Sequence, residues 1–153
     1  MESGGNHYEK ILFATSEAVP FIKTGGLADV AGSLPKFFDK EKYDVRVMLP
    51  KYMCMKESWK EKLQYKTHFI LDLGWRTQYV GFWRQSMKES PFILSIMNYI
   101  LMVLHHMERC IQMLRSFHFF SKAVLSALPV IDFRPDIIHC HDWQTGLISD
   151  ISG

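Results

Sequence analysis

The sequence contains few cysteines, and their spacing excludes the structures that cysteines usually build. Only three occur, Cys54, Cys110 and Cys140, and no two of them form a C-x-x-C pair. An odd number of scattered cysteines predicts neither a disulfide framework nor a zinc knuckle. This cysteine usage fits a protein of the reducing cytoplasm.

Long hydrophobic stretches and a strong charge imbalance are also missing. The longest apolar run, residues 92–104, is interrupted by Ser95 and Asn98. It is shorter than the roughly 20 residues that a membrane-spanning helix needs. The first ten residues are polar and lack the apolar core of a signal peptide. The net charge of +2 is too small to indicate nucleic acid or an anionic membrane as a partner.

The chain does contain enough apolar material for one folded domain. It has 153 residues, of which 48% are hydrophobic. Residues 11–14 form a short apolar run that predicts a buried strand of a parallel sheet. Apolar residues at helical spacing predict a helix over 27–38, and the valine-rich alternation of 43–49 predicts a second strand. Strand, helix and strand in this order predict a βαβ unit.

The same alternation returns towards the end of the sequence. Residues 119–128 are predicted to form an amphipathic helix that is followed by Pro129, and residues 136–140 a buried strand. Asp142 is a candidate cap for a helix that begins near Trp143. Strands that alternate with helices predict an α/β fold, a Rossmann-like, doubly wound parallel sheet.

The loop between the first strand and the first helix carries a candidate phosphate site. Gly25 and Gly26 have no Cβ, so the backbone there can approach a ligand closely. The following helix presents free N–H groups and the positive end of its dipole. Lys23 adds a full positive charge. Together these features predict a cradle for a phosphate or diphosphate. The alternative is a plain glycine turn with a solvated lysine; the spacing of a P-loop is absent.

A second candidate site follows the strand at 136–140. His139 and His141 face the same way along a strand and lie at its carboxyl end, where open α/β sheets bind ligands. We expect His141 to hydrogen-bond a sugar hydroxyl or a developing charge, and His139 to be a packed histidine. A metal pair is the alternative, but it needs a third ligand that the sequence does not place.

Several other conspicuous residues are interpreted as structural. Glu17, directly after the first strand, is expected to be a solvated loop carboxylate. Trp59, Trp75 and Trp83 are interpreted as packing residues or surface aromatics. Residues 56–66 mix lysines and glutamates, which is typical of a solvated helix face.

Four blocks of the sequence together resemble a known family. They are residues 10–21, residues 23–35, which contain Lys-Thr-Gly-Gly-Leu, residues 45–52, and residues 135–147, which contain His-Cys-His-Asp-Trp. These blocks closely resemble bacterial glycogen synthases and plant starch synthases of the ADP-glucose type. The resemblance covers roughly residues 8–81 and 118–148.

The resemblance implies a function and a domain organisation. The family transfers glucose from ADP-glucose to the non-reducing end of an α-1,4-glucan such as glycogen, with retention of configuration. It uses two Rossmann-like domains in the GT-B architecture, and neither a metal nor a cofactor. Residues 8–148 are then part of the N-terminal domain, and the C-terminal domain is absent, so this piece alone is expected to be inactive in the bacterial cytoplasm.

Other functions stay open beside this one. They are a related GT-B enzyme that forms sucrose or trehalose, a non-catalytic nucleotide- or glucan-binding domain, and a non-functional gene remnant.

The resemblance also assigns roles to individual residues. It implies that Lys23 lies near the phosphates of the donor, and that Gly25 and Gly26 bring the backbone close to the diphosphate and glucose. Asp29 lies near the donor, and His141 contacts the donor glucose. The implied ADP-glucose-binding residues are Lys23, Thr24, Gly25, Gly26 and Asp29, and the implied catalytic residue is His141.

The resemblance is lost between residues 82 and 117 and resumes abruptly at Phe119. Codons allowed for residues 82–89, read from their third bases, can encode Leu-Glu-Ala-Glu-Tyr-Glu-Gly, which resembles the missing family segment. We therefore interpret 82–117 as out-of-frame sequence; a diverged insertion that folds as a helix is the alternative. Residues 149–153 also leave the family pattern. Because such a segment was never selected to pack here, we expect marginal stability or aggregation.

Overall fold

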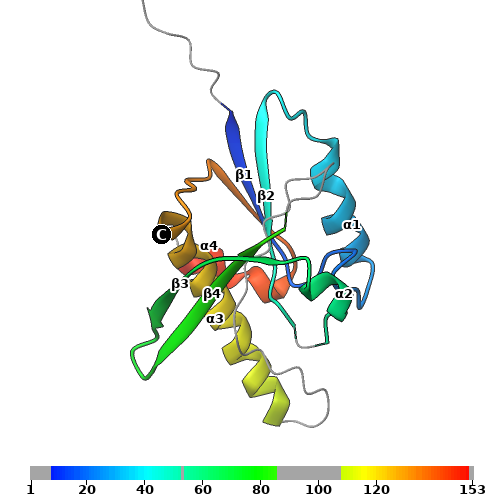
Figure 1. The fold of residues 1–153 in the computed structure, drawn as a ribbon. Helices are drawn as coiled ribbons and strands as arrows, with labels where there is room; N and C mark the ends of the chain where they lie inside the picture. Colours follow the sequence, from blue (N-terminus) through cyan, green and yellow to red (C-terminus); the bar gives the residue numbers. More distant parts are fainter. Residues whose placement is uncertain (1–7, 53, 86–107, 152–153) are drawn as a thin grey trace, which may run out of the picture.

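A three-stranded parallel sheet forms the centre of the molecule (Figure 1). The computed structural model describes residues 8–52, 54–85 and 108–151, with side chains from residue 117 onward in the last range. The strand order is β2-β1-β5, with β1 at Glu9–Ala14, β2 at Tyr43–Met48 and β5 at Ile137–Cys140. The predictions of three strands and of a parallel α/β sheet are confirmed.

Both faces of this sheet are buried. Successive side chains of a strand point to opposite faces. Leu12 and Ala14 of β1 therefore belong to one hydrophobic cluster, and Ile11 and Phe13 belong to another. A strand that is covered on both sides has a continuous apolar run instead of alternating polarity. This is why residues 11–14 carry no polar position.

One face is covered by the predicted helix, which is shorter than expected. Helix α1 spans Leu27–Ser33, and the chain then tightens into the 3-10 helix η1, Leu34–Phe37. Pro35 has no N–H with which to continue the α-helical hydrogen bonds. Gly32 packs against Val19, and a Cβ at this glycine would overlap the Val19 backbone and side chain. This contact holds α1 against the segment that follows β1.

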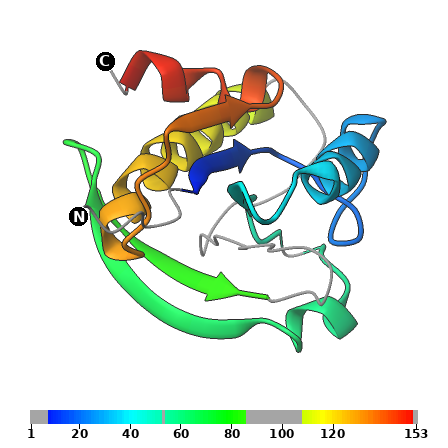
Figure 2. The ribbon, with the colours of Figure 1, turned by 90° about the horizontal axis from the view of Figure 1, so that it is seen from above.

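The other face is covered by a long helix and a β-hairpin (Figure 2). Helix α3 spans Glu108–Val130, so Pro129 lies inside its last turn and not after it, as the sequence had suggested. Strands β3, Gln64–Asp72, and β4, Thr77–Arg84, form an antiparallel pair. Leu71 and Val80 of the hairpin join Phe120 of α3 in the same cluster.

The expectation for residues 56–66 needs correction, and the expectation for residues 82–117 falls mostly on residues whose side chains are not described. The predicted helix face over 56–66 is wrong in extent, because only Glu57–Lys60 is helical (α2) and Gln64 already belongs to β3. Most of the segment 82–117 lies outside the residues with described side chains. In the described part of the chain, no helix combines the length and the apolar character that crossing a membrane requires.

Candidate functional site

The segments that follow β1, β2 and β5 all begin at one edge of the sheet. The N–H of His141 donates to the carbonyl of Ala14 at 2.9 Å, and the N–H of Thr15 donates to the carbonyl of Met48 at 3.0 Å. Because the three strands are parallel, this is their carboxyl edge, the place where open α/β sheets bind ligands. The structure therefore brings the two predicted motifs, the glycine loop after β1 and His141 after β5, to the same edge.

Glu17 is the residue that the sequence interpretation missed. Its side chain is buried, with the residue only 6% exposed, so the expectation of a solvated carboxylate is wrong. One carboxylate oxygen accepts hydrogen bonds from the N–H and hydroxyl of Thr24 and from the N–H of Gly25, at 3.2 Å for Gly25. The other accepts from the N–H of Ala28 at 3.2 Å. Glu17 thus holds the glycine loop from the inside.

The surroundings of Glu17 favour its ionised form. Burial raises the pKa of this carboxyl group, but the hydrogen bonds from Thr24, Gly25 and Ala28 outweigh burial and lower the pKa below its ordinary value. Glu17 is therefore an anion at neutral pH. A carboxylate shortly before a glycine loop that opens a helix was the signal in the sequence, because helix N-termini attract negative charge.

The two loop glycines are not required by the fold. Among the described glycines, only Gly74 has a positive φ, so neither Gly25 nor Gly26 needs the conformational freedom of glycine. A Cβ at Gly26 would meet no atom within 4 Å, and one at Gly25 would make an ordinary 3.6 Å contact with Glu17 Oε1. Open space beside Gly26 fits close approach of a ligand better than a tight turn.

Lys23 and Asp29 form an ion pair on the outer side of this loop. Lys23 Nζ lies 2.8 and 2.6 Å from the two carboxylate oxygens of Asp29. Both side chains are about half exposed, at 54% and 55%. An exposed pair of this kind contributes about 0–1 kcal/mol to stability, so a ligand anion can compete for the lysine. Lys23 is thus exposed and paired with Asp29, which leaves both the phosphate site and the plain glycine turn open.

The predicted binding residue Thr24 is exposed, but its hydroxyl group and its N–H are directed towards Glu17. Its hydroxyl and its N–H both donate to Glu17, so both of these donors are used within the protein. The structure therefore separates the loop residues into an inner group, Thr24 with Glu17, and an outer group, Lys23 with Asp29.

His141 is buried and carries an unused ring nitrogen. It is 8% exposed, its ring stacks on Phe13 at 5.3 Å between centroids, and its Nε2 has no hydrogen-bond partner among the described residues. Burial, with a smaller contribution from His139, lowers the pKa of His141 below its ordinary value. The ring is therefore neutral at pH 7. A buried polar atom without a partner is uncommon and suits a ligand contact.

His139 differs from the expectation of a packed residue. Its side chain is exposed, although its ring contacts Phe13 and lies 4.4 Å from the ring of His141. The two rings do share one face, as predicted. No group of three metal-ligating side chains occurs within the described residues, so the pair has no third ligand there. Within the same residues, Cys54 and Cys140 are free thiols.

The residues around the site behave largely as predicted. Asp142 caps the following turn, accepting from the N–H of Trp143 at 2.7 Å, although that turn is the 3-10 helix η2, Trp143–Thr145. Trp59 packs on Phe21, and Trp75 is exposed. Trp83 contacts Tyr65 and Lys51. All three tryptophans are thus packing or surface residues.

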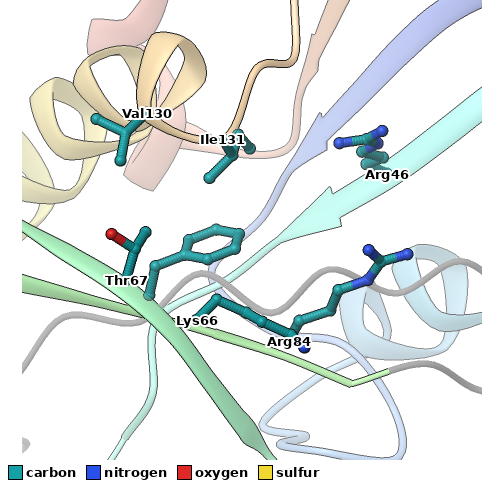
Figure 3. A pocket seen from close by; sticks show the side chains of 7 residues that line it. Arg46, Lys66, Thr67, Arg84, Val130 and Ile131 are labelled. Atoms are coloured by element: carbon teal, nitrogen blue, oxygen red, sulfur yellow. The ribbon is translucent and has the colours of Figure 1, made fainter.

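A cavity of about 270 Å³ lies elsewhere, between β2, the hairpin and the end of α3 (Figure 3). Three cationic side chains, Arg46, Lys66 and Arg84, line it together with Thr67, Phe82, Val130 and Ile131. None of these residues comes from the segments that follow β1 or β5. The cavity is therefore separate from the glycine loop and His141.

A parallel α/β sheet with a glycine loop and a buried histidine at its carboxyl edge fits the class of GT-B glycosyltransferase domains that the sequence resemblance implied. A family model described as the starch synthase catalytic domain matches residues 10–150, and the chain belongs to this family.

Named relatives agree with this assignment. The chain is 56% identical to a glycogen synthase of Lachnospira eligens and 51% identical to one of Lachnoclostridium phytofermentans, in each case over 92% of this chain and 29% of the relative. It also resembles the catalytic domain of starch synthase IV from Arabidopsis thaliana, solved with ADP and acarbose, at a TM-score of 0.74 and 26% identity. That match covers 93% of this chain and 29% of the other. The chain thus spans less than a third of the length of these relatives.

Proposed function

We propose that this chain forms the N-terminal side of an ADP-glucose site in a glycogen synthase. The whole enzyme would transfer glucose from ADP-glucose to the non-reducing end of an α-1,4-glucan, with retention. The observation that carries the proposal is Gly26, which adjoins open space and, like its neighbour Gly25, has no positive φ that would require glycine. The name of the solved relative, a starch synthase bound to ADP and acarbose, supports the same ligand class.

Lys23, Asp29 and the backbone at Gly26 each have a role in this proposal. Lys23 would leave Asp29 to pair with a donor phosphate, where its charge would stabilise the diphosphate as it departs. Asp29 would keep Lys23 near the loop until the donor arrives. The loop backbone at Gly26 would approach the diphosphate, since no Cβ stands between them. Neither a metal nor a cofactor has a part in this scheme.

His141 would contact the donor glucose. Its neutral ring has one free nitrogen at a buried position, and a sugar hydroxyl is a matching partner for such a nitrogen. The contact would orient the glucose relative to the diphosphate, so that bond cleavage and glucan attack occur at one anomeric carbon. Orientation of this kind is a large part of enzymatic rate enhancement.

The proposal for this chain alone is binding of ADP without transfer, because in this family the remaining donor contacts come from the C-terminal domain. We propose a bacterial cytoplasmic setting, and the bacterial origin of the relatives supports the bacterial part. A non-catalytic glucan-binding domain is a competing function, and a glucan pull-down would support it if glucan is retained while ADP is not bound. A non-catalytic nucleotide-binding domain is the other competing function, and it would bind ADP without transfer as this chain alone is proposed to do.

An NMR titration of the 153-residue chain with ADP tests the proposal. We expect the amide signals of Gly25, Gly26 and Leu27 to shift, and Lys23→Ala to weaken the interaction. Lys36→Ala is the matched control, because Lys36 is exposed and lies beyond the loop. Absence of any shift at millimolar ADP would refute the donor-site proposal. Glucose transfer from ADP-glucose to glycogen by this chain would refute its inactivity.

We also propose that residues 82–117 are out-of-frame sequence within the 8–148 domain. The proposal rests on the sequence that appears when codons allowed for this segment are read from their third bases, because that sequence resembles the family. Determination of the nucleotide sequence around codons 82 and 117 tests it, and a gene in which no single-base shift restores the pattern would refute it. Low stability of the chain, with melting below about 60 °C, stays a prediction.

A further inference from the structure

Glu17 is the most constrained polar residue in the loop region, and the proposed donor contacts leave it without a role. Two hydrogen bonds fix its backbone: the Thr15 hydroxyl donates to the Glu17 carbonyl at 2.8 Å and accepts from the Glu17 N–H at 3.4 Å. Its carboxylate then accepts four hydrogen bonds from residues 24–28. One side chain therefore connects the end of β1 to the start of α1.

A buried carboxylate is costly unless hydrogen bonds or a cation compensate its charge. No ion pair to Glu17 occurs within the described residues, so N–H and hydroxyl donors carry the whole compensation. Three of these donors are backbone N–H groups that would otherwise be free to bind an anion. A residue that only stabilised the fold could be apolar at this position, as Ala18 is beside it.

The distribution of the remaining donors points to positioning. Glu17 uses the N–H groups of Thr24, Gly25 and Ala28. The N–H groups of Gly26 and Leu27 lie between them, and neither donates to an acceptor within the described residues. Anchors on both sides therefore set the direction of the two free N–H groups before any ligand arrives.

We propose that Glu17 is a positioning residue of the donor site, whose carboxylate holds residues 24–28 so that the Gly26 and Leu27 N–H groups face the ligand. This inference rests on the proposed function. Its physical basis is that a loop ordered in advance does not lose conformational freedom on binding, which raises affinity. Glu17 itself does not touch the ligand.

The test compares Glu17→Gln with wild type in the 153-residue chain. Glutamine is nearly isosteric but replaces one accepting oxygen by an NH₂ group, which cannot accept a hydrogen bond. We expect amide hydrogen exchange at Thr24, Gly25 and Ala28 to become at least about tenfold faster, while exchange in β1 and β2 changes little, because loss of a charged acceptor opens the loop locally. ADP affinity should fall about threefold to tenfold.

The control is Glu41→Gln, the same chemical change at an exposed carboxylate away from the loop. It should alter neither exchange at the loop nor ADP affinity. Loop protection in wild type should also decrease as the pH falls through the lowered pKa of Glu17, whereas Glu17→Gln should show no such dependence.

Three outcomes would overturn the inference. Unchanged exchange at residues 24–28 would show that Glu17 does not hold the loop. Equal acceleration of all amides would show a role in global stability alone. Tighter ADP binding by Glu17→Gln would show that the carboxylate competes with the ligand for the N–H groups. If wild type binds no ADP, the donor-site proposal fails, and positioning for that ligand fails with it, while the exchange data still report whether Glu17 holds the loop.

Discussion

The loop between β1 and α1 has an inner side and an outer side that differ in every physical respect. On the inner side, Glu17 is buried and accepts four hydrogen bonds, and Gly32 of the adjoining helix α1 leaves no room for a Cβ against Val19. On the outer side, Lys23 and Asp29 form an exposed ion pair, and Gly26 adjoins open space. In the proposals above, the inner side determines the shape of the loop and the outer side binds the ligand. Substitutions on the two sides should separate folding from affinity.

The largest effect is expected from Gly32→Ala on the inner side. The new methyl group would overlap the backbone of Val19, so α1 or the preceding segment has to move. Overpacking of this kind destabilises by about 1–3 kcal/mol. Urea unfolding followed by circular dichroism measures the free energy of unfolding. Equal stability of the variant and wild type would show that α1 and Val19 can move apart at little cost in free energy.

A smaller effect on a different quantity is expected from Lys23→Ala on the outer side. Loss of a charge-assisted contact to phosphate should weaken ADP binding about tenfold. Stability should change by less than about 1 kcal/mol, because the ion pair to Asp29 is exposed. Calorimetry with ADP measures the affinity, and urea unfolding measures the stability. A large loss of stability with unchanged affinity would show that Lys23 serves folding and not binding.

Gly26→Ala tests whether a methyl group on the outer side affects binding, whereas Gly32→Ala adds the same group on the inner side. Gly26 has an ordinary helical backbone with φ −69°, so alanine fits and should increase stability by about 0.4–1 kcal/mol. The same methyl group should hinder approach of the diphosphate and lower ADP affinity severalfold. Gly32→Ala is the matched comparison, since it adds the same methyl group on the inner side. A destabilised Gly26→Ala variant would show that the fold itself requires this glycine.

The smallest effect near neutral pH is expected from the titration of Glu17. Because its pKa is lower in the folded chain, the folded state binds its proton less readily than the unfolded state. The resulting stability is fully present above the ordinary carboxyl pKa of 4.5 and is lost as the pH falls through the lowered value. Urea unfolding between pH 7 and pH 3 measures this, and Glu17→Gln should show a weaker acid dependence than wild type. If stability falls with pH equally in wild type and in Glu17→Gln, the titration of Glu17 is not the cause of the acid dependence.

The hairpin and the inner side of the loop show where prediction from sequence failed. Side chains of β3 alternate between exposed and less exposed positions from Lys66 to Asp72, but the polarity of the residues does not follow this alternation, because Ile70 is exposed and Thr67 is half-buried. The pairing of β3 with β4 and its packing on α3 supply the order that local pattern does not. The burial of Glu17 was not predicted, because its hydrogen-bond partners lie seven to eleven residues away along the chain.

The sequence by itself determined the parallel core, the position of the glycine loop and the position of His141 directly after the strand β5. Apolar runs, helical spacing and the family-like blocks carry that information locally, since burial on two faces requires apolar residues wherever the chain folds that way. Only the tertiary structure decided which polar groups are used within the protein and which are free. Hydrogen bonds depend on distances between segments, and these became defined only when β1, α1 and β5 met at one edge of the sheet.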